Sequence, residues 1–337
     1  MTDLSTTYLG LSLKNPLVPS SGPLTSSFDT LRRLEDAGAA AVVLPSVFEE
    51  ALIHEQEMMY RFLDHQDIGH HEADTFLPEP ANYSSHLDKM LALICQCKQS
   101  LEIPVIGSLN GISPSGWIDC AQDMAEAGCD ALELNLYSIA ADASKSAADV
   151  ENELLDVVSQ LRTEVTLPLT VKISSQFSSP AHFAKQLEQR GTQGLVCFNR
   201  FYQPDIDLET LNLNPTLHLS SPIESLLRIR WIALLRGQLS TSLAATGGFH
   251  DYQEVLKALL AGADVVYLCS TLIKQGPQAL PHLLNAMTTW MTEKEYVSVA
   301  QLKGSLSFQH AISPSIYERA NYLDVMDSYT PSKGVQV

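Results

Sequence analysis

Three short apolar runs lie in the segment 194–271, and each ends in small or polar residues: GLVCFN (194–199), TSLAATGG (241–248) and DVVYLCST (264–271). A segment with helical periodicity separates each run from the next. Functional residues at the carboxyl ends of successive parallel strands are typical of a (β/α)8 barrel, in which the loops at that end carry the chemistry. This stretch therefore predicts an α/β fold of the barrel type.

Five further strand candidates precede this segment, and they are apolar almost throughout: PLVPSS (16–21), AAVVLPS (40–46), IPVIGSLN (103–110), ALELNLYS (131–138) and LPLTVKIS (167–174). Continuous apolar strands are typical of parallel sheets that are covered on both faces. Helices are expected to begin near Phe28, Ser84, Gly116, Ala148, Pro180, Pro222, Tyr252 and Pro277. No G-x-G-x-x-G follows the first strand, which argues against a dinucleotide-binding sheet. Eight strand–helix units in order predict a (β/α)8 TIM barrel over residues 1–304.

Three segments fall outside this repeat. Residues 47–82 form a long insertion after strand 2, and residues 200–221 form another after strand 6. Both lie on the functional face of a barrel, so they are candidate lids or substrate loops. Residues 305–337 form a C-terminal tail, which we expect to dock either on the barrel or on a neighbouring subunit of a homo-oligomer, in the simplest case a dimer.

The charge and the cysteine pattern limit the possible partners. The chain has 39 acidic and 21 basic residues and a net charge of −18, which repels nucleic acid and anionic lipid. Neither a signal-peptide pattern nor an apolar run long enough to cross a bilayer is present, so we expect a cytoplasmic protein without a membrane partner. The six cysteines form no C-x-x-C pair, which argues against zinc or an iron–sulfur cluster bound by this chain alone.

Two loops near the end of the barrel repeat form the first candidate site. Gly247 and Gly248 follow strand 7, and Ser270 and Thr271 follow strand 8. Backbone N–H groups that converge beside the start of a helix, here with Asp251 as its expected cap, can bind an anion. A tight turn would also account for the two glycines taken alone. Together the two loops are similar to the phosphate site of TIM barrels and predict a phosphorylated ligand.

Four polar residues near the ends of strands 4, 5 and 6 form the second candidate group: Asn135, Ser138, Lys172 and Asn199. A lysine inside an apolar strand must either neutralise a negative charge or extend to the rim of the barrel. The other three residues could simply end their strands and bond to loop backbone. Their shared position favours a ligand that develops negative charge, such as a reduced flavin.

Other chemistry has little support in the sequence. Acidic and histidine residues gather in one segment of the first insertion: Asp64, His65, Asp67, His70, His71, Glu72 and Asp74. Their spacing matches no metal-ligand motif, so we expect no metal site. There is also no G-x-S-x-G and no pattern that indicates a Ser/His/Asp triad, which leaves hydrolase chemistry without a positive sign.

Several segments, taken in order, resemble the dihydroorotate dehydrogenases, a family of FMN-binding α/β barrels: NPLVPSSG (15–22), ALELNLYS (131–138), LPLTVKIS (167–174), the block 243–277 and YVSVAQLKGSL (296–306). The similarity runs from about residue 8 to residue 307 and is most specific from strand 7 to helix 8. It implies FMN as cofactor and an oxidoreductase that converts dihydroorotate, or a similar small pyrimidine-like substrate, to orotate in pyrimidine biosynthesis.

The resemblance also implies roles for single residues. Matches to the cofactor-binding positions of the family are Ser20, Ser21 and Gly22 along the flavin ring, Lys172 at its N1–O2 edge, Ser221 before helix 6, and Gly247, Gly248, Ser270 and Thr271 around the phosphate. Asn135 and Asn199 match asparagines that hold the substrate. Ser138 matches the catalytic base, which is cysteine in the soluble class of the family and serine in the membrane-associated class.

The chain departs from the family pattern mainly around the substrate. Pro45 stands where the family has a lysine, and the loop 72–84 lacks the motif N-x-x-G-L-x-N. Tyr137-Ser138-Ile139-Ala140 replaces the S-C-P-N or S-S-P-N motif, and Leu219-Ser220-Ser221 replaces a glycine-rich turn. Three hypotheses follow. The chain oxidises dihydroorotate with Ser138 as base, activated by a loop histidine such as His65 or His70; or it uses FMN on a different substrate; or it is a non-catalytic FMN-binding barrel.

Overall fold

The computed structural model describes residues 2–55, 57–58, 84–111 and 117–319, together with Tyr322, Val325, Met326 and Ser328. Eight strands form its central sheet: β3 (Leu17–Pro19), β4 (Val42–Phe48), β5 (Val105–Asn110), β6 (Ala131–Asn135), β7 (Leu169–Ile173), β8 (Gly194–Cys197), β11 (Ser242–Thr246) and β12 (Val265–Leu268). All neighbouring strands pair in parallel, in the order β4, β5, β6, β7, β8, β11, β12, β3.

The two outer strands of this order, β3 and β4, meet and bring the sheet close to full closure. The Ala40 N–H donates to the Leu17 carbonyl at 3.0 Å. Nearer the carboxyl ends of the two strands, the Ser46 N–H donates to Ser21 Oγ at 3.1 Å. The predicted (β/α)8 TIM barrel is therefore confirmed.

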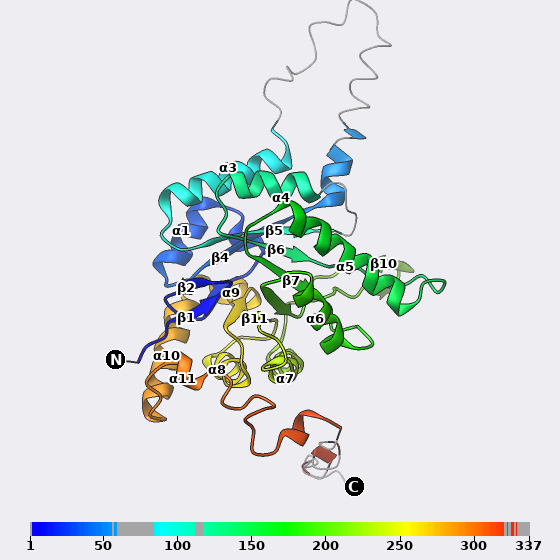
Figure 1. Cartoon of the computed structure of the whole chain (residues 1–337). Helices are drawn as coiled ribbons and strands as arrows, with labels where there is room; N and C mark the ends of the chain where they lie inside the picture. The colour runs from blue at the N-terminus through cyan, green and yellow to red at the C-terminus, as the bar shows by residue number, and fades with distance from the viewer. Residues whose placement is uncertain are drawn as a thin grey trace, which may run out of the picture.

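Helices cover the outside of this barrel: α1 (Phe28–Asp36), α3 (His86–Ser100), α4 (Trp117–Glu126), α5 (Ala147–Glu164), α6 (Pro180–Gln189), α7 (Ser225–Leu235), α8 (Tyr252–Ala261) and α10 (Ala279–Glu293). Figure 1 shows them arranged around the strands. Three of them, α3, α5 and α8, begin at a residue whose side chain accepts from a free N–H group of the first turn, as the Ser146 hydroxyl does from the Asp149 N–H. A short helix η3 (Pro222–Glu224) precedes α7, and two short helices, α9 (Ser270–Gln275) and α11 (Val299–Leu302), flank α10.

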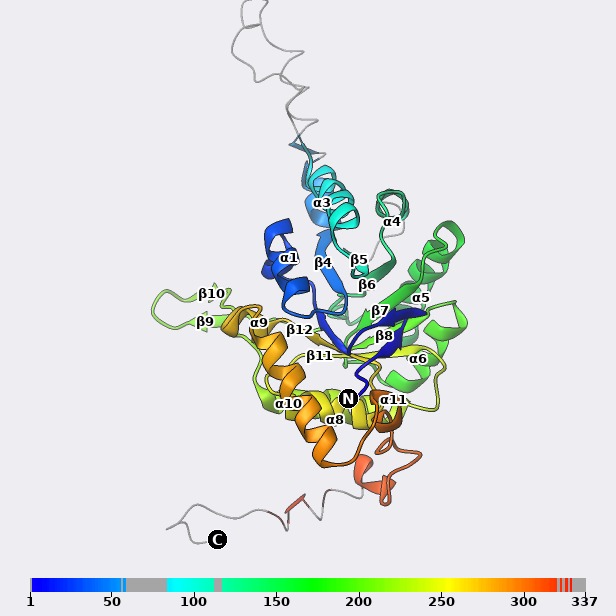
Figure 2. The same cartoon turned by 90° about the vertical axis from the view of Figure 1, so that its left-hand side faces the viewer.

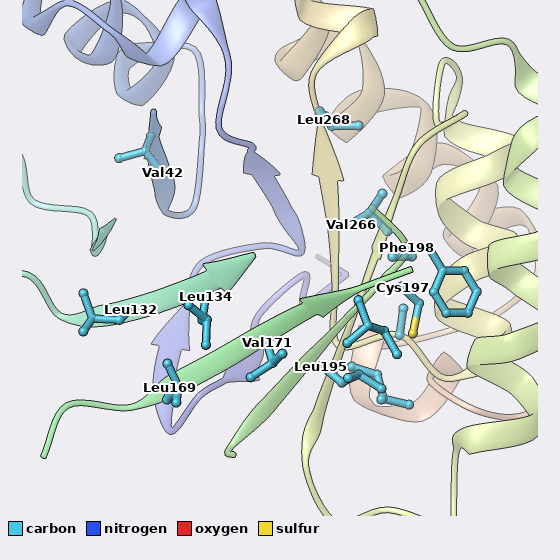
Figure 3. Packing of buried hydrophobic residues seen from close by; sticks show 14 of the residues in the cluster. Val42, Leu132, Leu134, Leu169, Val171, Leu195, Cys197, Phe198, Val266 and Leu268 are labelled. Atoms are coloured by element: carbon cyan, nitrogen blue, oxygen red, sulfur yellow. The ribbon is translucent and has the colours of Figure 1, made fainter. Parts of the chain in front are cut away.

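Side chains alternate between the two faces of every barrel strand, because successive residues of a strand point to opposite sides. The outward set packs against the helices, and Figure 3 shows part of it: Val42, Leu132, Leu134, Leu169, Val171, Leu195, Cys197, Val266 and Leu268. The inward set of β6 is Ala131, Glu133 and Asn135. The inward set therefore becomes more polar toward the carboxyl end of the barrel, where a binding site is expected.

An N-terminal hairpin of β1 (Thr6–Tyr8) and β2 (Leu11–Leu13) lies at the amino end of the barrel. Tyr8 is fully buried, and its hydroxyl lies 3.0 Å from both Thr170 Oγ1 and Tyr267 Oη. Both partners belong to the inward sets of barrel strands. The hairpin therefore fills the end of the barrel that is opposite to the predicted site.

The insertions and the tail have distinct structures. Residues 49–55 of the first insertion are helical. The second insertion contains a hairpin of β9 (Asp205–Asp207) and β10 (Asn212–Asn214), which projects from the barrel in Figure 2. The tail returns to the barrel, where Phe308 N–H donates to the Ala233 carbonyl on α7. Across the described parts of the chain, no helix has both the length and the apolar character that a membrane crossing requires.

Candidate active site

A cavity of about 540 Å³ opens at the carboxyl end of the barrel, and its volume lies within the roughly 300–1,000 Å³ of cofactor and small-molecule sites. Residues from the ends of most barrel strands and from the 200–221 insertion line it: Ser20, Ser21, Gly22, Ser46, Phe48, Asn110, Asn135, Tyr137, Lys172, Phe198, Asn199, Arg200, Tyr202, Leu217, Leu219, Ser220, Thr246, Gly247, Gly248, Phe249, Tyr267, Cys269, Ser270 and Thr271 among them. Ten of the sequence-predicted positions therefore meet around one space.

One end of the cavity is formed by the turn that follows β11. Gly247 and Gly248 have φ angles of 92° and 91°, which glycine adopts without strain. A Cβ atom at Gly248 would lie 2.4 Å from the backbone nitrogen of Ser225, so the start of α7 approaches this turn too closely for any side chain. The two glycines therefore leave bare backbone facing the cavity.

A hydroxyl network joins this turn to the loops before η3 and after β12. The Gly248 N–H donates to Ser220 Oγ at 3.3 Å, and Ser220 Oγ donates to Ser270 Oγ at 2.9 Å. The Ser220 N–H also donates to Ser270 Oγ at 3.1 Å. Thr271 Oγ1 donates to the Phe249 carbonyl. Three loops that are distant in sequence are thus held together as one polar cradle.

Two cations lie behind this cradle. Arg228 on α7 is 7% exposed, and its guanidinium donates to the Thr246 carbonyl at 3.1 Å and to the Glu224 carbonyl at 2.9 Å. Lys274 on α9 donates to the Ser220 carbonyl at 3.3 Å. Positive charge, hydroxyls and bare glycine backbone form the donor set that an anion such as a phosphate requires.

Lys172 enters the cavity from the inward face of β7 and is 8% exposed. Its Nζ lies 3.6 Å from Oε1 of Glu133, which is fully buried on β6. Neither oxygen of Glu133 has a hydrogen-bond partner among the described residues. Burial raises the pKa of Glu133, and the nearby Lys172 opposes that shift in part. The pair holds a cation at the floor of the cavity.

A second polar cluster lies on the floor beside Lys172. Asn135 Nδ2 donates to Ser46 Oγ at 3.0 Å and to Ser108 Oγ at 3.2 Å, and these two hydroxyls are 2.7 Å apart. Ser46 reaches this position because the pairing of β4 with β5 shifts register between Val43 and Ser46. Pro45 lies in that irregular stretch. The next residue, Ser46, lines the cavity.

The mouth of the cavity is aromatic and basic. Tyr137 packs edge-on against Phe201 with ring centroids 4.4 Å apart. The Arg200 guanidinium lies 5.6 Å from the ring centroid of Tyr202, and its Nε is 3.1 Å from Glu224 Oε2. Asn199 lies deeper, with its Nδ2 at 3.5 Å from Asn135 Oδ1. This mouth would contact whatever enters the cavity beyond Lys172.

The structure places two predicted site residues elsewhere. Ser138 lines a second cavity of about 340 Å³, between the segment after β6 and residues 174–178. The large cavity is lined by its neighbour Tyr137. Ser221 is exposed, and Ser220 is the serine of that turn that lines the cavity. In both cases the side chain one residue earlier faces the large cavity.

The acidic and histidine cluster between Asp64 and Asp74 lies outside the residues that the structure describes, and so do His65 and His70 as partners for Ser138. Within the described ranges, no three histidine, cysteine or acidic side chains come together as metal ligands.

Several contributors to the site had only weak signs in the sequence. Glu133 lies between two leucines of its strand, as Lys172 lies between Val171 and Ile173. A charged residue inside an apolar strand could therefore have indicated that Glu133 belongs to the site. Ser220 and Arg228 belong to a turn and a helix, where polar residues are common. Their role depends on the approach of α7 and α9 to the turn after β11, which local sequence does not reveal.

The fold and the site together define a TIM-barrel protein with a polar cradle and a buried lysine in one cavity at the carboxyl end of the barrel. A family model described as dihydroorotate dehydrogenase matches residues 81–291. The chain belongs to the dihydroorotate dehydrogenase family.

Curated relatives extend the similarity along the chain. The catalytic subunit of dihydroorotate dehydrogenase B (NAD(+)) from Thermoplasma acidophilum is 25% identical over 307 residues, which cover 90% of this chain and 99% of the relative. The protein of the same name from Halalkalibacterium halodurans is 27% identical over 306 residues, or 84% of this chain and 95% of the relative. At this identity the chain is a divergent member of its family.

Proposed function

We propose that this protein is an FMN-dependent oxidoreductase that converts a CH–CH bond of dihydroorotate, or of a related cyclic amide, to a double bond. The observation that carries the proposal is that the anion-binding cradle and Lys172 open into the same cavity. A phosphorylated cofactor with a ring that becomes anionic needs both features in one space. Family membership supports the same class of reaction.

The residues present fit FMN. Gly247 and Gly248 line the cavity without side chains, and Ser220, Ser270 and Thr271 supply hydroxyls beside them. Ser20, Ser21 and Gly22 line the wall between this cradle and Lys172 and are proposed to contact the ring system. FMN, when bound, supplies the acceptor for the hydride that leaves the substrate.

The remaining residues are proposed to position and to stabilise charge. Lys172 provides a fixed positive charge where negative charge develops, and Glu133 holds that ammonium group in the barrel floor. Asn135 and Asn199 offer amide groups to a polar cyclic substrate. Ser138 remains a proposed base. Because it lines the second cavity, this role requires the segment after β6 to turn its side chain toward the large cavity.

A second candidate function is an FMN oxidoreductase with a different substrate. The specific observation that favours it is the mouth of the cavity, where Tyr137 and Phe48 present apolar surface and Arg200 is already paired with Glu224. A carboxylated pyrimidine prefers charge-assisted partners over such a surface. A larger or less polar cyclic substrate would suit it better.

The test is an absorption spectrum of the purified protein, an FMN titration and anaerobic addition of dihydroorotate. A flavin spectrum that bleaches with dihydroorotate supports the first function. A stable flavin spectrum that does not bleach favours the second function. A protein that neither contains nor takes up FMN contradicts both and leaves a non-catalytic barrel.

Ser138→Ala tests the proposed base separately. If dihydroorotate is the substrate and Ser138 its base, this variant should bind FMN normally but lose flavin reduction. Tyr137→Phe is the matched control, because it changes a neighbouring hydroxyl that faces the large cavity. Reduction of Ser138→Ala at the wild-type rate would remove Ser138 from the mechanism.

A further inference from the structure

His250 lies directly behind the anion-binding cradle, and none of the roles above includes it. It follows Gly248 and Phe249 in the turn after β11 and is partly exposed. Its Nε2 is 3.3 Å from Ser220 Oγ, and its Nδ1 is 3.3 Å from Thr271 Oγ1. The imidazole therefore bridges the two hydroxyl loops of the cradle.

Both hydroxyls that face this ring already donate their protons elsewhere. Thr271 Oγ1 donates to the Phe249 carbonyl, which can only accept. Ser220 Oγ donates to Ser270 Oγ. Each ring nitrogen of His250 thus faces an oxygen that can accept. A neutral imidazole has one N–H and satisfies one of these oxygens, whereas the imidazolium has two and satisfies both.

The charges around the ring oppose this protonation in part. Burial and the Lys274 ammonium on α9 lower the pKa of His250, while a hydrogen bond with the Ser220 backbone and, less strongly, Glu254 on α8 and Glu224 on η3 raise it. A phosphate group held by Ser220, Ser270 and the glycine turn would add negative charge close to the ring. An opposite charge nearby favours the charged form of a titrating group.

We propose that His250 takes up a proton when a phosphate group binds in the cradle, and that the imidazolium then fixes Ser220 and Thr271 around that phosphate. This inference rests on the proposed function, because FMN is the ligand that would bring the phosphate. His250 is a positioning residue in this scheme, because it acts through the two hydroxyls and does not line the cavity itself.

The experiment compares wild type with His250→Gln in FMN titrations followed by flavin fluorescence, from about pH 6 to about pH 8, where histidine changes its charge. Binding should be tighter at low pH in the wild type, since the complex holds the proton more strongly than the free protein. The wild-type to variant affinity ratio should fall several-fold as the pH rises over this range, and toward tenfold over a wider one, if binding raises the pKa of His250 by one unit. The titration of the FMN phosphate itself is common to both proteins and cancels in the ratio.

Two controls define the source of the effect. Riboflavin has the same ring system without the phosphate, so its affinity ratio should stay constant with pH. His282→Gln removes an exposed histidine from α10 and should behave as wild type. Calorimetry of the wild type in buffers of different ionisation enthalpy should also show proton uptake with FMN and less with His250→Gln.

The outcomes separate this inference from the proposed function. A ratio that does not change with pH, or that changes equally for riboflavin, overturns the role of His250 and leaves FMN binding intact. Absence of FMN and riboflavin binding to the wild type at every pH overturns both the role of His250 and the proposed function.

Discussion

Glu133 and Lys172 place two charges inside the barrel, where water solvates them poorly. A buried carboxylate without hydrogen bonds is costly, and one cation at 3.6 Å offsets that cost only in part. Such a pair is weak evidence for stability. Its position at the floor of the cavity agrees with the proposal that Glu133 orients Lys172 toward a ligand.

Glu133→Gln is expected to change the pH dependence of stability. Burial raises the pKa of Glu133 above its ordinary value of 4.5, so the folded protein keeps a proton that the unfolded chain releases. The free energy of unfolding of the wild type should therefore fall as the pH rises from 4.5 to the folded pKa, by about 1.4 kcal/mol for each unit between the two values. Glutamine removes this fall. Urea unfolding across the range measures it.

Glu153→Gln is the matched control for this experiment. Glu153 is an exposed helix residue that forms an ion pair with Lys145 at 2.6 Å. Its removal should leave the wild-type pH profile nearly unchanged, because exposed pairs contribute little. If the free energies of unfolding of wild type and Glu133→Gln changed with pH in the same way, the raised pKa of Glu133 in the folded protein would be contradicted.

Among the elements, the junction between the turn after β11 and the start of α7 shapes the cradle most directly. Gly248 has a left-handed φ, and the backbone of Ser225 and Ser221 lies where its Cβ would be. Arg228 on the next turn of the helix bonds to the Thr246 carbonyl that precedes the glycines. Helix and turn are thus fitted to each other as one unit.

Gly248→Ala should push the start of α7 away from the turn after β11 and so destabilise the protein. Alanine in the left-handed region costs about 1–3 kcal/mol, and the overlap with backbone adds a similar amount. FMN should also bind more weakly, since the cradle must open. Gly276→Ala is the matched control: Gly276 also has a positive φ, of 73°, but apart from its chain neighbours no atom of the described residues lies within 4 Å of its Cβ position. Urea unfolding and FMN titration of both variants test this, and equal losses would contradict the fitted junction.

The sequence predicted the barrel elements well because their signals are local. Continuous apolar strands and caps such as Asp251 mark the units, and the positions of Lys172 and Asn135 near the ends of their strands indicated that they share one end of the barrel. The position of Ser138 was inferred from a motif. After β6 ends at Asn135 the chain leaves the strand, and its path there directs Tyr137 to the cavity. Motif spacing does not specify that path.

Other features could not be predicted because they depend on tertiary approach or on very short elements. The two hairpins have strands of three residues, too short for a period to appear. His250 looks like an ordinary turn residue until Ser220 and Thr271 lie on either side of it.

At the scale of the whole barrel, the carboxyl end holds the cavity and the amino end holds a buried cluster of polar contacts. The cavity occupies the carboxyl end, and a buried carboxylate, Asp264, organises the amino end. Asp264 accepts from the Leu243 N–H at 2.7 Å and lies 2.7 Å from Lys303 Nζ and 3.2 Å from Arg236 Nη1. The Thr6 hydroxyl of the N-terminal hairpin donates to its carbonyl. One residue therefore ties the hairpin, a barrel strand and two helix ends together.

Asp264→Asn is expected to lower the free energy of unfolding by about 3–5 kcal/mol, because it leaves two cations without their buried partner. FMN binding should change little, since the cradle lies at the opposite end. Asp130→Asn is the matched control, with one cation, Lys98, and a more exposed side chain; its loss should be smaller. Urea unfolding with a parallel FMN titration measures both. A large loss of FMN affinity at unchanged stability would contradict the separation of the two ends.

The pairing of β3 with β12 has a consequence for folding during synthesis on the ribosome. Leu17 to Pro19 pair with Val266 to Leu268, so the first barrel strand has no partner on that side until nearly the whole barrel has been synthesised. At roughly 5–20 residues per second, that wait lasts on the order of ten to fifty seconds. An open strand edge can pair with other chains throughout this time. We therefore expect the order of the strands to make the nascent chain prone to wrong pairing until β12 has been synthesised.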